Sequence, residues 1–251
     1  MKRFVISMYV CCCAVFCSCS DDDKLPDVRP AAKGEYTDVR DGNTYGWVRI
    51  GDLEWMTENL KYQVGGLPYY ECTYDVFGAN YPVAVRSQLI NTDFEADYET
   101  YGNFYTWQEA VESCPEGWRL PTDEDWKNLE MALGMSAGDA NAEGWRGSRE
   151  ATLLQQGEEG TGMALLLGGE AASTAAWETG LFWSFVGEYG YYWSASEVKD
   201  NGLQTATVWF RKIGAHYTTV YRGAVTLQRL MRVRCCRDAG KCYGFLTDFY
   251  E

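Results

Sequence analysis

Few side chains in this sequence are of the kind that performs enzyme chemistry. His216 is the single histidine among 251 residues. This excludes a zinc site built from two or three histidines, and a Ser/His/Asp or Cys/His catalytic group would have to include this one residue. Residues 215–218 alternate as in a strand, so we expect a packed or solvent-facing strand histidine. Phosphate-loop, dinucleotide and zinc-protease motifs are absent too, so we predict no catalytic residue, no enzyme activity and no cofactor.

The ten cysteines are a second set of reactive groups, and half of them lie within the first 19 residues. The five that follow are Cys72, Cys114, Cys235, Cys236 and Cys242. In an oxidising compartment this odd set allows two disulfides and one free thiol. Adjacent cysteines on a strand point to opposite faces, so Cys235 and Cys236 are not expected to bond to each other.

Four acidic residues could be metal ligands. Asp93, Glu95, Asp97 and Glu99 alternate along the chain, so on a strand they would share one face, and clustered carboxylates can bind Ca²⁺. No glycine-pinned loop fixes their spacing, and the Glu-Pro-Asn and Gln-Pro-Asp triplets of calcium-dependent lectins are absent. We interpret these residues as a solvated acidic face and predict no metal site.

Aromatic residues are concentrated between positions 177 and 193. Rings stack on sugar faces and make rigid contact surfaces at low entropic cost, so this segment is a candidate ligand-binding surface. Tyr191 and Trp193 alternate as on a strand, and we assign them to the core. Trp177, Trp183 and Tyr189 lie among glycine, serine and glutamate residues, where core and surface roles are equally open. These three are the predicted ligand-binding residues.

The net charge of the chain limits the kinds of partner that it is expected to bind. Asp and Glu number 36 against 22 Lys and Arg, which gives a net charge of −14. A field of this sign repels nucleic acids and anionic lipid headgroups. We therefore predict no nucleic-acid partner.

The N-terminus predicts export. Lys2 and Arg3 precede an apolar run of about 13 residues, which fits a signal peptide and is shorter than the ~20 residues that span a bilayer. The run ends in FCSC, residues 16–19, which resembles a bacterial lipobox. We predict a lipoprotein signal peptide over residues 1–18 and lipidation of Cys19, so that the membrane is contacted through an N-terminal lipid. Cleavage by an ordinary signal peptidase, without an anchor, is the alternative.

An acidic segment follows the predicted anchor. Residues 21–23 are all aspartate, and acidic residues directly after a lipidated cysteine resemble the export signal of Bacteroidota lipoproteins, which implies the outer face of the outer membrane. We interpret residues 19–35 as a lipidated, flexible acidic tether and residues 36–251 as a folded domain.

The elements that position these residues are of mixed type and predict an α+β domain. Residues 45–50 and 53–56 form a hairpin by their turn chemistry, and residues 106–113 form a helix. Thr122 is the N-cap of a second helix that ends at Gly134 and buries Trp126, Leu129 and Leu133. Strand-like segments at 191–196, 205–211, 216–222 and 230–237 predict an antiparallel sheet. Residues 134–190 are expected to form a long, loop-rich insertion.

Six segments resemble, in order, the blocks of the Fibrobacter succinogenes major paralogous domain family. They are DGNTY (41–45), IG with WMTENL (50–60), YGNFYTW (101–107), CPEGWRLPT with Trp126 (114–126), YWSAS (192–196) and VRCCRD (233–238). The resemblance implies a single C-type lectin-like domain, similar also to the formylglycine-generating enzyme domain, in an exported protein of Bacteroidota. Two short helices would pack on an antiparallel sheet.

The resemblance also bears on the cysteines. It implies a disulfide between Cys114 and Cys235. Family members often have a second cysteine before the YGNFYTW block, where this chain has ADYET (96–100), so Cys72 lacks its expected local partner. Its pairing with Cys236 or Cys242 is open.

Three functions from different classes fit the sequence. The first is a cell-surface lipoprotein that binds glycan or protein, without catalysis, in adhesion. The second is a structural or tip subunit of a surface appendage. The third is a formylglycine-generating-enzyme-like oxidase, but CPEGWRLPT is structural in those enzymes and a cysteine pair outside the implied Cys114–Cys235 bridge is not evident. We expect the first.

Overall fold

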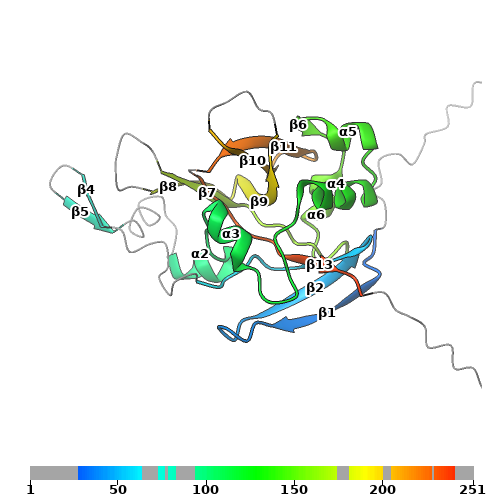
Figure 1. Ribbon diagram of the computed structural model, residues 1–251, viewed down its shortest axis with the longest axis horizontal. Helices are drawn as coiled ribbons and strands as arrows, with labels where there is room; N and C mark the ends of the chain where they lie inside the picture. Colours follow the sequence, from blue (N-terminus) through cyan, green and yellow to red (C-terminus); the bar gives the residue numbers. More distant parts are fainter. Residues whose placement is uncertain are drawn as a thin grey trace, which may run out of the picture.

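Figure 1 shows the computed structural model of the chain, which describes residues 28–63, 73–76, 79–82, 94–173, 181–199, 205–227 and 229–240. Helices and two main sheets are mixed, so the predicted α+β class is confirmed. The predicted signal peptide, the lipidation residue Cys19, and Cys72 and Cys242 lie outside the described residues. Within the described part, no helix is long and apolar enough to cross a membrane.

The first sheet joins the beginning of the domain to its end. Strands β1 (Ala32–Thr37), β2 (Thr44–Ile50), β3 (Leu53–Met56) and β13 (Cys236–Asp238) are antiparallel and adjacent in that order. They are the blue and red strands of Figure 1. The predicted β2–β3 hairpin is confirmed, and its turn uses Gly51 at φ +62°, a conformation that favours glycine. Strand β1 begins at Ala32, so the sheet includes the last residues of the range that we assigned to the tether.

Two helices begin at the expected threonines. Helix α3 (Trp107–Ser113) has Thr106 as its N-cap, and α4 (Asp123–Ala132) has Thr122. Both caps are reciprocal, because the third helical residue returns a side-chain hydrogen bond to the cap backbone, an arrangement that stabilises a helix by about 1 kcal/mol. Gly134, at φ +113°, follows α4, and the predicted inward face of Trp126, Leu129 and Leu133 is buried.

The second sheet has seven strands in the order β12-β7-β9-β10-β11-β6, with β8 paired to β7. They are β6 (Gly144–Arg146), β7 (Gly168–Ser173), β8 (Leu181–Val186), β9 (Tyr189–Glu197), β10 (Thr207–Gly214), β11 (Val220–Thr226) and β12 (Arg229–Leu230). The loop-rich insertion expected over residues 134–190 is wrong, because this range holds β6, β7, β8, α5 (Ala137–Asn141) and α6 (Glu150–Leu154). These elements are too short to show a periodic pattern.

Three further expectations are corrected. Glu95, Asp97 and Glu99 belong to helix α2 (Phe94–Tyr101), so they do not share a strand face, and Asp93 lies outside the described residues. His216 is exposed in the turn between β10 and β11 and is not in a strand. Residues 230–237 do not form one strand, because 233–235 run between β12 and β13 without strand pairing. The remaining strands, β4 (Thr73–Val76) and β5 (Ala79–Pro82), form a separate hairpin.

Two apolar clusters make up the core, and the adjacent cysteines point into different ones. Cys235 packs with Trp193 and Tyr105, whereas Cys236 packs with Trp126 and Trp55. Cys235 is bonded to Cys114, which is 121 positions earlier in the sequence. The implied disulfide is therefore confirmed, and so is the expectation that the two neighbours point to opposite faces.

Candidate functional site

The three residues predicted to bind ligand have different outcomes. Trp177 lies outside the described residues. For Trp183 the structure describes the backbone, which lies in β8 opposite Ala171. Tyr189 begins β9 and is half-buried in a group of rings. Tyr191 and Trp193, assigned to the core from their alternation, are buried, which confirms that assignment.

A row of side chains crosses the face of the seven-stranded sheet on which Tyr189 lies. Lys212 in β10 is directly opposite Tyr191 in β9 and Tyr221 in β11, and Tyr221 is opposite Trp145 in β6. Directly opposed residues of antiparallel strands point to the same face. Four strands therefore place neighbouring side chains on one surface.

More rings extend this surface at the end of the sheet where β9 begins. Tyr217 stacks on Trp145, with ring centroids 3.9 Å apart and planes within 4°. Tyr189 contacts Tyr217 at 6.1 Å and Phe185 at 5.7 Å. Tyr217 is 38% exposed and Phe185 44% exposed, so the rings reach solvent. We call this surface the aromatic platform and define it as Trp145, Phe185, Tyr189, Tyr217 and Tyr221.

Glycines make room for the rings. A Cβ on Gly214 would lie 2.8 Å from the Tyr217 ring and 2.9 Å from the Tyr189 ring. A Cβ on Gly223 would lie 2.6 Å from the Tyr221 ring. Any larger residue at these positions would displace the rings. The arrangement of the rings therefore depends on glycine in β10 and β11 as much as on the aromatic residues.

Phe185 reaches the platform through an unusual backbone conformation. Its φ is +70°, in the left-handed region that is sparsely populated by residues with a side chain. Such strain costs of order 1 kcal/mol or more and is concentrated at functional sites. The end of strand β8 thus holds an exposed ring beside Tyr189 at an energetic cost.

Lys212 is at the centre of the platform. Its Nζ lies 4.5 Å from the ring centroid of Tyr221, 5.0 Å from Tyr189, 5.1 Å from Trp145 and 5.7 Å from Tyr191. Ring faces attract a cation at these distances. Burial nevertheless lowers the pKa of Lys212, and the charge of Glu170 opposes that shift.

Glu170 is the acidic group that acts on Lys212, but its carboxylate is already bound. Arg229 Nη1 donates to Glu170 Oε1 at 2.7 Å. Burial raises the pKa of Glu170 even so. Among the described residues, no carboxylate forms an ion pair with Lys212.

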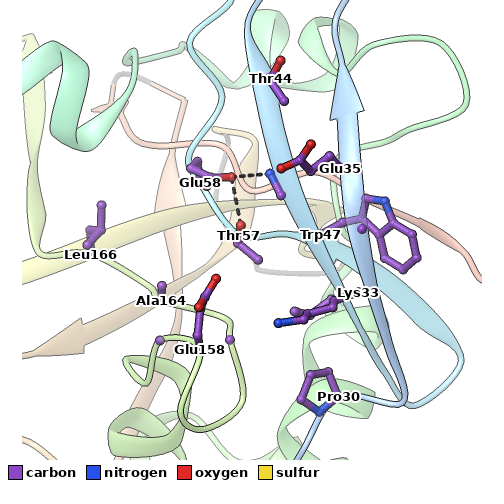
Figure 2. Close-up of a pocket in the computed structure, with 15 residues that line it drawn as sticks. Pro30, Lys33, Glu35, Thr44, Trp47, Thr57, Glu58, Glu158, Ala164 and Leu166 are labelled. Atoms are coloured by element: carbon purple, nitrogen blue, oxygen red, sulfur yellow. Dashed lines mark hydrogen bonds between the residues drawn. The ribbon is translucent and has the colours of Figure 1, made fainter.

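A separate groove lies between the first sheet and the segment 157–166 (Figure 2). Its volume is 730 Å³, within the range of small-ligand sites. The strand side contributes Lys33, Glu35 and Trp47, and the opposite segment contributes Glu158. In Figure 2, Lys33 extends toward the segment that carries Glu158.

The carboxylate at the centre of the groove, that of Glu58, already accepts hydrogen bonds from groups of the protein. Glu58 Oε2 accepts from the backbone N–H of Gly46 at 2.8 Å and from the hydroxyl of Thr57 at 2.9 Å, as Figure 2 shows. Much of the remaining wall is glycine or alanine, and Trp47 is its one aromatic ring. The groove thus offers a ligand fewer stacking faces than the platform does.

Neither a reactive cysteine nor a metal site is evident among the described residues. Cys236 is buried, and burial raises its pKa to about 12, so its thiol is a poor nucleophile at neutral pH. In the described parts of the chain, no group of three or more His, Cys, Asp or Glu residues is placed to hold a metal ion.

Most of the platform was missed from the sequence. Trp145 lay in the range that we interpreted as loop, and Lys212 followed directly after the strand expected over 205–211. The alternation of Phe210 with Lys212 and of Tyr221 with Gly223 was the available signal, because it gives both strands one face of rings, a cation and small residues.

Comparison with known proteins assigns the family. No curated protein and no solved structure matches the chain. The model of the Fibrobacter succinogenes major domain matches residues 48–237. This range includes the resembling segments from residue 50 to residue 237, whereas DGNTY (41–45) lies before it. The chain belongs to the Fibrobacter succinogenes major domain family.

Proposed function

We propose that this protein is a non-enzymatic, cell-surface binding module whose aromatic platform binds glycan. One observation carries the proposal: four adjacent strands place Trp145, Tyr221, Lys212 and Tyr191 in one row, beside the exposed rings of Tyr217 and Phe185. Flat ring faces stack on the C–H faces of sugars, and a lysine among them can donate hydrogen bonds to hydroxyl groups.

Rigidity supports binding at this surface. The rings are held by contacts with one another and by backbone without side chains at Gly214 and Gly223. A surface that is ordered before binding loses little conformational entropy when the ligand arrives. Exposed rings on an ordered sheet are otherwise unfavourable in water.

A C-type lectin-like fold is part of this proposal. The support is the pairing of the first and last strands within one sheet, the two capped helices, and the Cys114–Cys235 bridge. An oxidase of the formylglycine-generating type would need a reactive cysteine pair. Cys235 is bonded to Cys114, and Cys236 is buried with a raised pKa.

A subunit of a surface appendage is the second candidate. Its basis is β1, an edge strand to which another chain could add a strand. The charged, exposed side chains of Lys33 and Glu35 on that strand oppose such pairing. We therefore favour the binding module.

The proposed location is the outer surface of the outer membrane. The lipid on Cys19 would anchor the protein, and the aspartates at 21–23 would act as its export signal. Protease treatment of intact cells should remove the domain. Cys19→Ala should release the protein from the membrane fraction. Digestion that requires cell lysis would overturn the surface location, and a Cys19→Ala protein that stays in the membrane would overturn the anchor.

Glycan binding is tested with the full chain, purified in a detergent that has no sugar headgroup, on an array of surface and dietary polysaccharides. Tyr217→Ala should weaken binding about 5- to 30-fold, the loss of 1–2 kcal/mol typical of an exposed ring that contacts ligand. Trp47→Ala, in the groove, should leave binding unchanged. Loss with Trp47→Ala but not with Tyr217→Ala would place the ligand in the groove and overturn the proposal.

A further inference from the structure

We infer that the glycan bound at the aromatic platform is acidic, and that Lys212 binds the carboxylate of its sugar ring. This inference rests on the proposed glycan binding and narrows it to one chemical class. Its basis is the position of Lys212, whose ammonium lies within 6 Å of the centroids of four rings contributed by three other strands.

The ammonium lacks an anionic partner among the described residues. Charged groups that are partly removed from water normally acquire a counter-ion or a set of hydrogen bonds. Among the described residues, the carboxylate that acts on Lys212 is that of Glu170, and Arg229 binds it at 2.7 Å. The rings attract the cation, but a ring face accepts no strong hydrogen bond, so the three N–H donors of the ammonium are left for solvent or ligand.

Other half-buried cations of the domain differ from Lys212. Arg237 pairs with Glu54 at 2.6 Å, Lys127 with Asp123 at 3.3 Å, and Lys61 with Glu99 at 2.6 Å. The chain has an excess of carboxylates, with 36 acidic residues, so acids available for pairing are abundant. Arg234 is buried and no described acid pairs with it, but the backbone carbonyls of Met56 and Met163 accept hydrogen bonds from its guanidinium. The Lys212 ammonium has neither a described acid nor a described carbonyl acceptor, which leaves it able to bind an external anion.

The class of anion follows from what surrounds the ammonium. A phosphate-rich ligand needs several cations, and the net charge of −14 opposes a polyanion. One lysine matches one carboxylate. The rings on either side match apolar C–H faces, and a pyranose with a ring carboxylate offers both groups within one residue.

The test measures binding of the full chain to three probes: the methyl glycoside of galacturonic acid, its methyl ester, and sialyllactose, so that each acid carries one carboxylate. The ester keeps the sugar and removes the negative charge. Wild-type protein should bind one of the two acids, and if that acid is the uronate, it should bind at least 10-fold more tightly than its ester. The two acids separate a uronate from a sialate as the source of the carboxylate.

Lys212→Gln should lower the affinity for the acid at least 10-fold and leave the affinity for the ester unchanged. Lys212→Arg, which keeps the charge, should retain binding within about 3-fold of wild type. Lys199→Gln changes the net charge equally at an exposed position, so it should have no effect beyond that of general electrostatics. Thermal melting of each variant establishes that it is folded, and Lys212→Arg keeps the test decisive if the glutamine variant is not.

The outcomes separate this inference from the proposed function. Neutral sugars bound as well as acidic ones, with binding sensitive to Tyr217→Ala, would overturn the acidic ligand and keep the platform. Binding of an acid that depends on Lys212 but not on Tyr217 would overturn the stacking platform. Equal losses with Lys199→Gln and Lys212→Gln would show a general charge effect and overturn the role of Lys212. Absence of binding to all three probes would overturn the acidic-glycan inference in its stated form.

Discussion

Two consecutive residues of β10 are basic, and their side chains lie on opposite faces of the seven-stranded sheet in very different surroundings. Arg211 points toward α4, where Asp123 and Glu130 bind its guanidinium at 2.8 Å each. Lys212 points to the opposite face, into a group of rings. Arg211 is 1% exposed, whereas Lys212 keeps contact with solvent. Two consecutive basic residues therefore have unrelated surroundings.

The α4 face is a network of paired charges. Asp123 also binds Arg222 at 2.7 Å, and Glu130 binds Arg146 at 2.6 Å. Arginine suits such sites, because its planar group makes several hydrogen bonds in fixed directions. The network connects helix α4 to β6, β10 and β11, so we interpret it as structural.

The difference between the faces separates a role in stability from a role in binding. On the α4 face, each cation is bound by acids of the same chain, and removal of one partner leaves a buried charge. On the platform face, the cation is flanked by rings, and none of the described residues accepts a hydrogen bond from it. Substitutions on the first face should thus affect folding, and those on the second should affect ligand binding.

The largest expected effect is that of Asp123→Ala. This change leaves Arg211 and Arg222 buried without their shared carboxylate, and loss of one partner of a buried pair typically costs about 3–5 kcal/mol. Urea unfolding should show this loss. Glu124→Ala is the control, because Glu124 has a side chain that is 67% exposed and should change stability by less than about 0.5 kcal/mol. Equal, small effects of both changes would contradict a structural role for the network.

A similar contrast exists within the platform face itself. Trp193 is fully buried in the apolar cluster that includes Cys235, whereas Tyr217 is 38% exposed. Trp193→Ala should cost about 3–5 kcal/mol of unfolding free energy, and Tyr217→Ala should cost less than about 1 kcal/mol. A large thermal destabilisation by Tyr217→Ala would mean that the ring is part of the core and that the platform is not a free surface.

Lowering the pH should weaken the ion pairs that Asp123 forms on the α4 face and so lower the stability of the fold. Burial acts to raise the pKa of Asp123, but Arg222 and Arg211 outweigh it and lower that pKa to about 2. A carboxyl whose pKa is depressed in the folded state stabilises the fold above its unfolded pKa and loses that contribution as the pH falls through the folded pKa. Between pH 4 and pH 2 the protein should lose about 2 kcal/mol from this group. Asp123→Asn should lose correspondingly less over the same interval, and an unchanged acid dependence would contradict the assignment.

Local chemistry explains which parts of the fold could be predicted. The cap at Thr122 and the turn at Gly51 depend on a few consecutive residues, and they were predicted correctly. The helix expected over 106–113 is present, but the role of Thr106 as its N-cap was not predicted. The disulfide between Cys114 and Cys235 came from the family resemblance instead. Strand β6 has three residues, and β7 consists mostly of glycine and alanine, so both have too little pattern to detect.

The site was harder to predict because its parts meet only through long-range pairing. Tyr189 was a candidate from the aromatic density around it, and that role is still a prediction. Trp145 joins the platform through β11, whose residue Tyr221 is 76 positions away in sequence numbering. The strand expected over residues 205–211 ended one residue before Lys212. Because of this small boundary error, the sequence analysis did not identify the residue on which the acidic-glycan inference depends.

The smallest expected effect is that of Lys212→Met on stability. Methionine keeps an apolar stem against the rings of Tyr221 and Trp145. The change removes a favourable ring–cation attraction, but it also removes the cost of partly burying an ammonium, and these contributions oppose each other. Because burial lowers the pKa of Lys212, stability of the wild type should rise slightly as the pH increases through the folded pKa, and the methionine variant should lack this slope. Urea unfolding of Lys212→Met at neutral pH should differ from wild type by less than about 1 kcal/mol, in contrast to Asp123→Ala on the other face. A loss as large as that of Asp123→Ala would show that Lys212 is as structural as Arg211, and the distinction between the two faces of β10 would fail.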